Sequence, residues 1–234
     1  IPCPAITGHG CEIITARHGA EALVKALQAP PDVVISDLLM PVMDGWTLLA
    51  RVREHSRLAA VPFILPRTPV TELGTLLEEG YLPAVARSFE EAFPGARFTN
   101  HAHQGLGGKL SVQPGSRHEI LVDALAHGEV VGLYFPCLTE YSLPAAVERM
   151  AGLPEHLLLA GGFDTAAAFI AAPDLLLRTD GYPPLLWLAG LQGEKPGIGY
   201  HFEAYGYNLT FNRRPHLDQT AEYWWSGVTV LAPA

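Results

Sequence analysis

A short apolar run that ends on a carboxylate, DVVISD at residues 32–37, constrains the fold more than any other feature of the sequence. Runs of this kind are typical of strands that are buried on both faces of a parallel sheet. The spacing of apolar residues predicts helices at 18–28 and 46–55, and further short strands are predicted at 12–16 and 61–65. Strands and helices that alternate with short connections predict βαβ units and a parallel sheet.

Asp37 stands at the carboxyl end of the central predicted strand. In open parallel sheets, binding groups collect at this edge because loops replace the flanking helices there. A carboxylate in such a place can act as a nucleophile that forms an acyl phosphate, or it can bind a divalent cation. The alternative is a strand-end aspartate that only caps the following turn.

Three blocks follow one another in this part of the chain: EIITARHGAEAL, PDVVISDLLMPVMDG and VPFI. Together they make residues 8–65 resemble the receiver domain of two-component response regulators. The resemblance implies an α/β fold of the flavodoxin-like type, with strand order 2-1-3-4-5. It also implies Mg²⁺ as the cofactor, and a histidine kinase or phosphotransfer protein as the partner that supplies a phosphoryl group.

The same resemblance implies roles for individual residues. Asp37 matches the phospho-accepting aspartate and would bind the Mg²⁺ ion, while Met40 would offer its backbone carbonyl near the cation. Pro41, Asp44 and Gly45 match the loop that shapes the site and leads into the next helix.

Other groups that receivers use are missing from the matching positions. The acidic pair that holds the metal would fall at or before Ile1, so it is not in this sequence. Residues 66–68 (PRT) replace the expected hydroxyl-alanine pair, and no lysine occurs between Lys25 and Lys109. Such groups stabilise a transferring phosphoryl. We therefore expect an incomplete or degenerate receiver. Either the chain is truncated ahead of Ile1, or another strand fills the place of the missing first strand, or the receiver part is a degenerate remnant packed on the second domain.

The pattern changes at Pro66, which predicts a receiver-like domain at 1–66 and an α+β domain at 67–234. In the second domain a helix is predicted at 73–93, with a break near Gly80 and Pro83. A loop or hairpin tip is predicted at 99–109. The further predicted elements are helices at 116–126, 143–150 and 164–171 and strands at 129–135, 156–160, 174–178, 184–191, 197–205 and 207–214.

Two local patterns refine these predictions. Ser116 and Glu119 have the spacing of a capping box, and Asp164 is predicted to cap the helix that follows it. The last two strands alternate apolar with polar residues around Gly206, which predicts an antiparallel hairpin. No family resemblance is predicted for residues 67–234.

Composition limits the function classes. The formal net charge is −9 and no basic stripe is present, so nucleic-acid binding is not expected. No apolar run reaches the roughly 18 residues of a membrane span. Three cysteines lie far apart, and their odd number favours a reducing compartment, which predicts a cytoplasmic protein.

The second domain offers weaker candidate sites. Residues 137–141, Asp164 and residues 201–203 carry polar groups that could serve an enzyme. A structural thiol is favoured for Cys137, and alternation along the strand predicts that His201 and Glu203 face solvent. The aromatic residues at 223–225 favour a core or a docking surface.

Two functions remain open at this point. The first is a response-regulator-like signalling protein that is coupled to an uncharacterised output domain. The second is a small-molecule-binding or enzymatic C-terminal module beside an inert receiver remnant, with protein–protein docking through that domain as a further possibility. The sequence does not decide whether the chain is an enzyme, although it leans against one.

Overall fold

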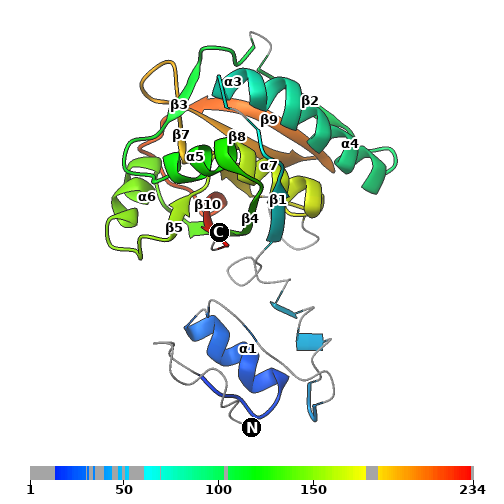
Figure 1. Ribbon diagram of the computed structural model, residues 1–234. Helices are drawn as coiled ribbons and strands as arrows, with labels where there is room; N and C mark the ends of the chain where they lie inside the picture. The colour runs from blue at the N-terminus through cyan, green and yellow to red at the C-terminus, as the bar shows by residue number, and fades with distance from the viewer. Residues whose placement is uncertain are drawn as a thin grey trace. The chain divides into compact units, whose positions relative to one another are not determined.

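The computed structural model describes residues 14–29, 31, 34, 40–43, 47–48, 51–52, 61–68, 70–102, 105–177 and 184–232 (Figure 1). The chain divides into two compact units, Ile1–Ala59 and Ala60–Ala234. The second unit begins at Ala60, whereas the sequence predicts a boundary at residue 66. No helix among the described residues is long and apolar enough to cross a membrane.

In the first unit, helix α1 spans Gly19–Gln28, as the apolar spacing predicts. It begins after His18, whose Nδ1 accepts a hydrogen bond from the Glu21 amide at 3.2 Å. Thr47, Leu48, Arg51 and Val52 are helical, in agreement with the helix predicted at 46–55. Ile14–Ala16 lie outside any strand, so the strand prediction is wrong for these residues. The predicted strand at 32–37 falls outside the described residues except for Val34.

The second unit is built on a mixed eight-stranded sheet with the order β1-β4-β10-β6-β8-β9-β2, and β5 pairs with β10 beside this path. Two of its pairings, β10 with β6 and β2 with β9, are parallel. The strands are β1 (Val61–Leu65), β2 (Phe98–Asn100), β4 (Val130–Thr139), β5 (Leu157–Leu159), β6 (Leu185–Trp187), β8 (Ile198–Tyr205), β9 (Asn208–Pro215) and β10 (Trp224–Leu231). A separate two-stranded sheet pairs β3 (Leu110–Val112) with β7 (Leu191–Gly193).

Strand β1 corrects one prediction. It forms where the sequence predicts a strand, but the pairing found among the described residues is with the second unit's sheet. It pairs antiparallel with β4, from Val61 opposite Tyr134 to Leu65 opposite Val130, and it forms one edge of the second unit's sheet. The apolar pattern of a short strand identifies the strand and not its partner, because a buried strand satisfies its ladder in either direction.

Helices surround the sheet at α3 (Leu73–Leu76), the π-helix η1 (Leu77–Tyr81), α4 (Leu82–Ala92), α5 (Glu119–His127), α6 (Leu143–Met150) and α7 (Gly162–Ala171). The segments α3, η1 and α4 follow one another directly, so the predicted helix at 73–93 is present. The predicted break near Gly80 and Pro83 is accommodated by a π-helical turn, with Pro83 in the first turn of α4, where its missing amide costs little.

Two helix starts differ from the capping predictions. Helix α5 begins after His118, and the Ser116 hydroxyl accepts from the His118 amide at 3.1 Å, so Ser116 and Glu119 do not form a capping box. Asp164 lies inside the first turn of α7 and accepts from the Gly161 amide at 2.9 Å. The strand predicted at 174–178 is not formed in its described part: residues 174–176 belong to a turn, residue 177 has no regular structure, and residue 178 lies outside the described residues.

The core covers both faces of this sheet. One core cluster contains Phe163, Phe169, Phe202 and Leu186. A second cluster contains residues of α6 together with Leu185, Trp187 and Trp224. Successive residues of β6 therefore enter different clusters, as the alternation of side chains along a strand requires. A polar residue on either face of the central strands is consequently buried.

Candidate functional site

The receiver-like residues predicted from the sequence are only partly described. Asp37, Asp44 and Gly45 lie outside the described residues, so their predicted roles remain predictions. Met40 and Pro41 are described, half-buried and exposed respectively, in an irregular segment that continues to Met43.

This Met40–Met43 segment is held against the start of α1. The Gly19 amide donates to the Met43 carbonyl at 3.0 Å, and a Cβ added at Gly19 would stand 2.7 Å from the same carbonyl oxygen. The segment bends sharply, with Val42 at a φ of 69° and 82% exposed. A β-branched residue rarely adopts this backbone conformation. The loop that follows the predicted acceptor strand is thus fixed by a close contact that only glycine allows.

A Mg²⁺ site is not assembled by the described residues. No group of three histidine, cysteine, aspartate or glutamate side chains lies close enough together to hold a metal ion in the described part of the chain. Of the implied ligands, only the Met40 backbone falls in that part. The structure therefore gives no geometry for the metal, and no chemical step is derived through it.

Asp164 was a candidate for chemistry in the second unit, and it lies at the centre of a buried polar cluster. Its Oδ1 accepts from the Gly161 and Thr165 amides at 2.9 and 3.0 Å, and its Oδ2 accepts from the Thr229 hydroxyl at 2.6 Å. The His118 Nδ1 stands 4.0 Å from the same Oδ2. All of these side chains are fully buried. The cluster joins the starts of α5 and α7 to β10, and it has no access to a substrate.

His118 is uncharged in this environment. Burial lowers its pKa below the ordinary value of 6.5, and the nearby Asp164 carboxylate offsets only part of this effect. The ring also fills the space next to Gly161, where an added Cβ would meet Nε2 at 2.3 Å. Sequence reasoning missed His118 because nothing in its local pattern marks it as buried.

The prediction that His201 and Glu203 face solvent is wrong for His201. The imidazole is 1% exposed and lies edge-on to Trp187, with a ring-centre distance of 5.2 Å. Its Nε2 contacts Glu203 Oε2 at 3.5 Å, and Arg214 approaches that oxygen at 3.9 Å. The prediction failed because this face of β8 is covered by the cluster around Trp187 and Trp224.

Burial lowers the pKa of His201, and contact with that imidazole lowers the pKa of Glu203. The group is therefore a neutral histidine beside an ionised carboxylate. It stabilises packing at the edge of the core, and it does not line the pocket described below.

Cys137 and the tryptophans have structural roles. Burial raises the pKa of the Cys137 thiol to about 11, so the thiolate needed by a nucleophile is scarce near neutral pH. Trp224 and Trp225 are buried in the two core clusters. They do not supply the exposed docking surface that was considered from the sequence.

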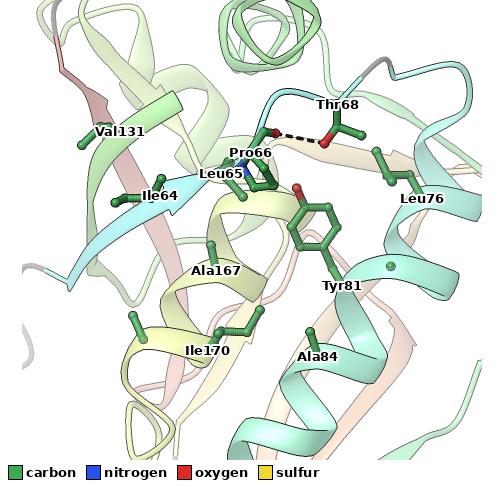
Figure 2. A pocket seen from close by; sticks show the side chains of 12 residues that line it. Ile64, Leu65, Pro66, Thr68, Leu76, Tyr81, Ala84, Val131, Ala167 and Ile170 are labelled. Atoms are coloured by element: carbon green, nitrogen blue, oxygen red, sulfur yellow. Dashed lines mark hydrogen bonds between the residues drawn. The ribbon is translucent and has the colours of Figure 1, made fainter. Parts of the chain in front are cut away.

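A pocket of about 800 Å³ lies in the second unit between β1, α7 and the helical segment η1–α4 (Figure 2). Ile64, Tyr81 and Ile170 are among its lining residues. No sequence signal marked this pocket, because its walls come from segments far apart in the chain and none of them carries a motif.

Comparison with known proteins identifies the N-terminal part of the chain. Residues 4–90 match the family described as the response regulator receiver domain. This range includes β1 and most of the α3–η1–α4 segment, so the family match continues from the first compact unit into the second. Residues 91–234 lie outside it.

Curated relatives agree with this match. A sensor histidine kinase, TmoS of Ectopseudomonas mendocina, is 35% identical over 99 residues, which are 42% of this chain and 10% of the kinase. A protein-glutamate methylesterase/protein-glutamine glutaminase of Archaeoglobus fulgidus is 40% identical over 76 residues, 32% of this chain and 19% of the relative. Protein PilG of Pseudomonas aeruginosa is 34% identical over 56 residues, 24% of this chain and 42% of PilG.

The chain thus spans less than half the length of each of these relatives. No solved structure matches it at a significant level. Residues 4–90 are thus similar to the receiver domain of two-component response regulators.

Proposed function

We propose that this chain is a signalling protein in which Asp37 accepts a phosphoryl group from a histidine kinase or phosphotransfer protein, and that the second unit is its output part. The observation that carries the proposal is the receiver sequence of residues 4–90, with Asp37, Met40, Pro41, Asp44 and Gly45 in the family's order. A cytoplasmic location belongs to the same proposal.

The proposed step is a displacement at phosphorus. A carboxylate oxygen of Asp37 attacks the phosphoryl group of a phosphohistidine, the P–O bond of an acyl phosphate forms, and the P–N bond breaks to release the imidazole. Mg²⁺, when bound, would neutralise charge on the phosphoryl oxygens. The Met40 carbonyl would face that ion, and the Gly19–Met43 hydrogen bond would hold the loop in place.

We also propose that the receiver is degenerate. No lysine lies between Lys25 and Lys109 to neutralise the phosphoryl group. The pairing of β1 with β4 supports the same conclusion, because a strand within the family match serves the sheet of the second unit. Transfer to Asp37 is therefore expected to be slow, since a charge that stabilises the transition state is missing.

The test is phosphoryl labelling of the full chain with acetyl phosphate and Mg²⁺, followed by intact-mass spectrometry. The wild-type chain is expected to gain one phosphoryl group, and Asp37→Asn to gain none. Asp32→Asn is the matched control, because it changes a neighbouring aspartate outside the assigned roles. Labelling that persists in Asp37→Asn, or that never occurs in the wild type, contradicts the proposal.

A second candidate function lies in the unit of residues 60–234, as a small-molecule-binding module. The pocket beside Tyr81 favours it, because its size falls within the roughly 300–1,000 Å³ of ligand sites. In this case the receiver segment is inert, and Asp37→Asn leaves binding to the pocket unchanged.

A further inference from the structure

The mouth of the pocket in the second unit is unusually apolar for a protein surface. Ile64 of β1 is 68% exposed, Val131 of β4 is 47% exposed and Ile170 of α7 is 37% exposed. All three line the same pocket (Figure 2). Single exposed apolar residues are common, but several gathered around one cavity mark a binding surface.

One end of the pocket is polar. Tyr81 is 9% exposed, and its hydroxyl has no hydrogen-bond partner among the described residues. The Thr68 hydroxyl donates to the Pro66 carbonyl at 2.9 Å, and Figure 2 shows both hydroxyls at the same end of the cavity. A buried hydroxyl without a partner is costly, so this end favours a ligand that can accept a hydrogen bond.

The state of Tyr81 defines what it can offer. Burial raises its pKa and outweighs the nearby Thr68 hydroxyl, which lowers it; the charge of Asp164 makes a smaller contribution that also raises it. The hydroxyl thus stays protonated over the physiological range and can donate a hydrogen bond.

The charge around the pocket excludes an anionic ligand. Among the described residues that line the cavity, none is lysine, arginine or histidine. An ionised carboxylate or phosphate would therefore lose its hydration without gaining a partner of opposite charge.

We propose that this pocket binds an uncharged, mainly apolar small molecule whose single carbonyl-type acceptor receives a hydrogen bond from Tyr81. This inference rests on the second candidate function and names its ligand class. The apolar body would lie against Ile64, Val131 and Ile170, and the acceptor would reach the end where Tyr81 and Thr68 lie.

The experiment uses the full chain and two fluorescent probes. The first is 6-propionyl-2-dimethylaminonaphthalene, an uncharged apolar ketone whose emission moves to the blue in apolar surroundings. The second is 2-dimethylaminonaphthalene, which lacks the ketone. Saturable binding of the first probe with a blue shift is expected.

Ala84→Trp fills the cavity and should weaken binding of both probes at least tenfold. Ala92→Trp, at an exposed position on the same helix, should leave the binding of both probes unchanged.

The hydrogen bond is tested by Tyr81→Phe. Loss of one neutral hydrogen bond should weaken binding of the ketone about five- to tenfold and leave the ketone-free probe unaffected. Tyr207→Phe, at an 85% exposed tyrosine, is the control and should change neither affinity.

Three results would contradict different parts of the inference. If no saturable binding occurs, or if binding survives Ala84→Trp, the pocket is not a ligand site, and the second candidate function is wrong as well. If Tyr81→Phe weakens both probes equally, Tyr81 does not donate a hydrogen bond to the ligand, but the candidate function still stands. A dimer in sedimentation that Ile64→Ser dissociates, while Ile120→Ser does not, assigns the apolar mouth to a second copy of the chain. The labelling test of Asp37 is independent of all three.

Discussion

Within the described residues, the two compact units contain carboxylates in contrasting surroundings. In the first unit, Glu21 forms exposed ion pairs with Arg17 at 2.9 Å and with Lys25 at 2.8 Å along α1. In the second unit, seven polar residues are buried within the described part of the chain: Ser116, His118, Asp164, Thr165, His201, Ser226 and Thr229.

This difference teaches how little a carboxylate reveals by itself. Glu21 and Asp164 both stand in the first turn of a helix, where a negative charge is favoured. Glu21 is partly exposed and pairs with two more exposed cations, whereas Asp164 is fully buried and enclosed by three hydrogen-bond donors. Exposed pairs contribute little to stability, and a buried carboxylate becomes indispensable to the groups that it satisfies.

The largest expected effect is that of Asp164→Ala. The change leaves the Gly161 and Thr165 amides and the Thr229 hydroxyl without their acceptor, so the free energy of unfolding should fall by about 3–5 kcal/mol. Urea denaturation of the full chain, followed by tryptophan fluorescence, measures this change.

Two further variants sharpen that result. Thr229→Val removes only one of the three hydrogen bonds and should cost about 1–2 kcal/mol. Asp174→Ala, at an exposed position after α7, should have almost no effect. If Asp164→Ala were no more destabilising than Asp174→Ala, the contrast between the two units would be lost.

A smaller effect is expected from acidification. Because burial lowers the pKa of His118 and of His201 in the folded protein, the unfolded chain takes up protons first as the pH falls through about 6.5. Stability is complete above that pH and declines below it, by roughly 2 kcal/mol between about pH 7 and pH 5.5 for two such groups.

Denaturation curves at several pH values would show this decline. The neighbouring charges are Asp164 and Glu119 at His118, and Glu203 and Arg214 at His201; the carboxylates oppose the decline and do not abolish it. Replacing both histidines with glutamine should flatten the curve over this range. His127→Gln, at an exposed histidine, should not change it. An unchanged slope in the double variant would show that other groups cause the decline.

The smallest expected effect concerns Glu21. Its contacts with Lys25 and Arg17 lower the pKa of the carboxyl from 4.5 to about 2. Because salt screens exposed charges, high ionic strength should raise this pKa toward 4.5, and an NMR titration of the Glu21 side chain would follow it. A pKa that does not respond to salt would mean that the ion pairs of Glu21 are shielded from water, so Glu21 and Asp164 would differ less than the structure indicates.

Sequence patterns predicted the elements whose signal is local. Helix α6 at Leu143–Met150 has the predicted bounds, and the hairpin of β8 and β9 turns at Gly206, where φ is 54°. In these cases the apolar spacing or the turn residue lies within the element itself.

Features that depend on distant residues could not be predicted. The pairing of β1 with β4 joins segments about seventy residues apart, as in Val61 with Tyr134, and no local pattern encodes it. The buried His201 contacts Trp187, which comes from another strand. Asp164 was recognised as a helix-start residue, but its partner Thr229 lies on the last strand of the sheet. The receiver residues around Asp37 were identified from their order in the sequence, and this recognition does not depend on their arrangement in space.

The position of β10 has a consequence for synthesis of the protein. Residues 224–231 lie between β4 and β6 and also pair with β5, so they join the two halves of the sheet. A chain that emerges from the ribosome in sequence order presents β4 and β6 long before the strand that connects them. During that interval each of the two strands has an unpaired edge. Unpaired strand edges tend to associate with other chains. The second unit is thus expected to need protection by chaperones until residues 224–231 have emerged.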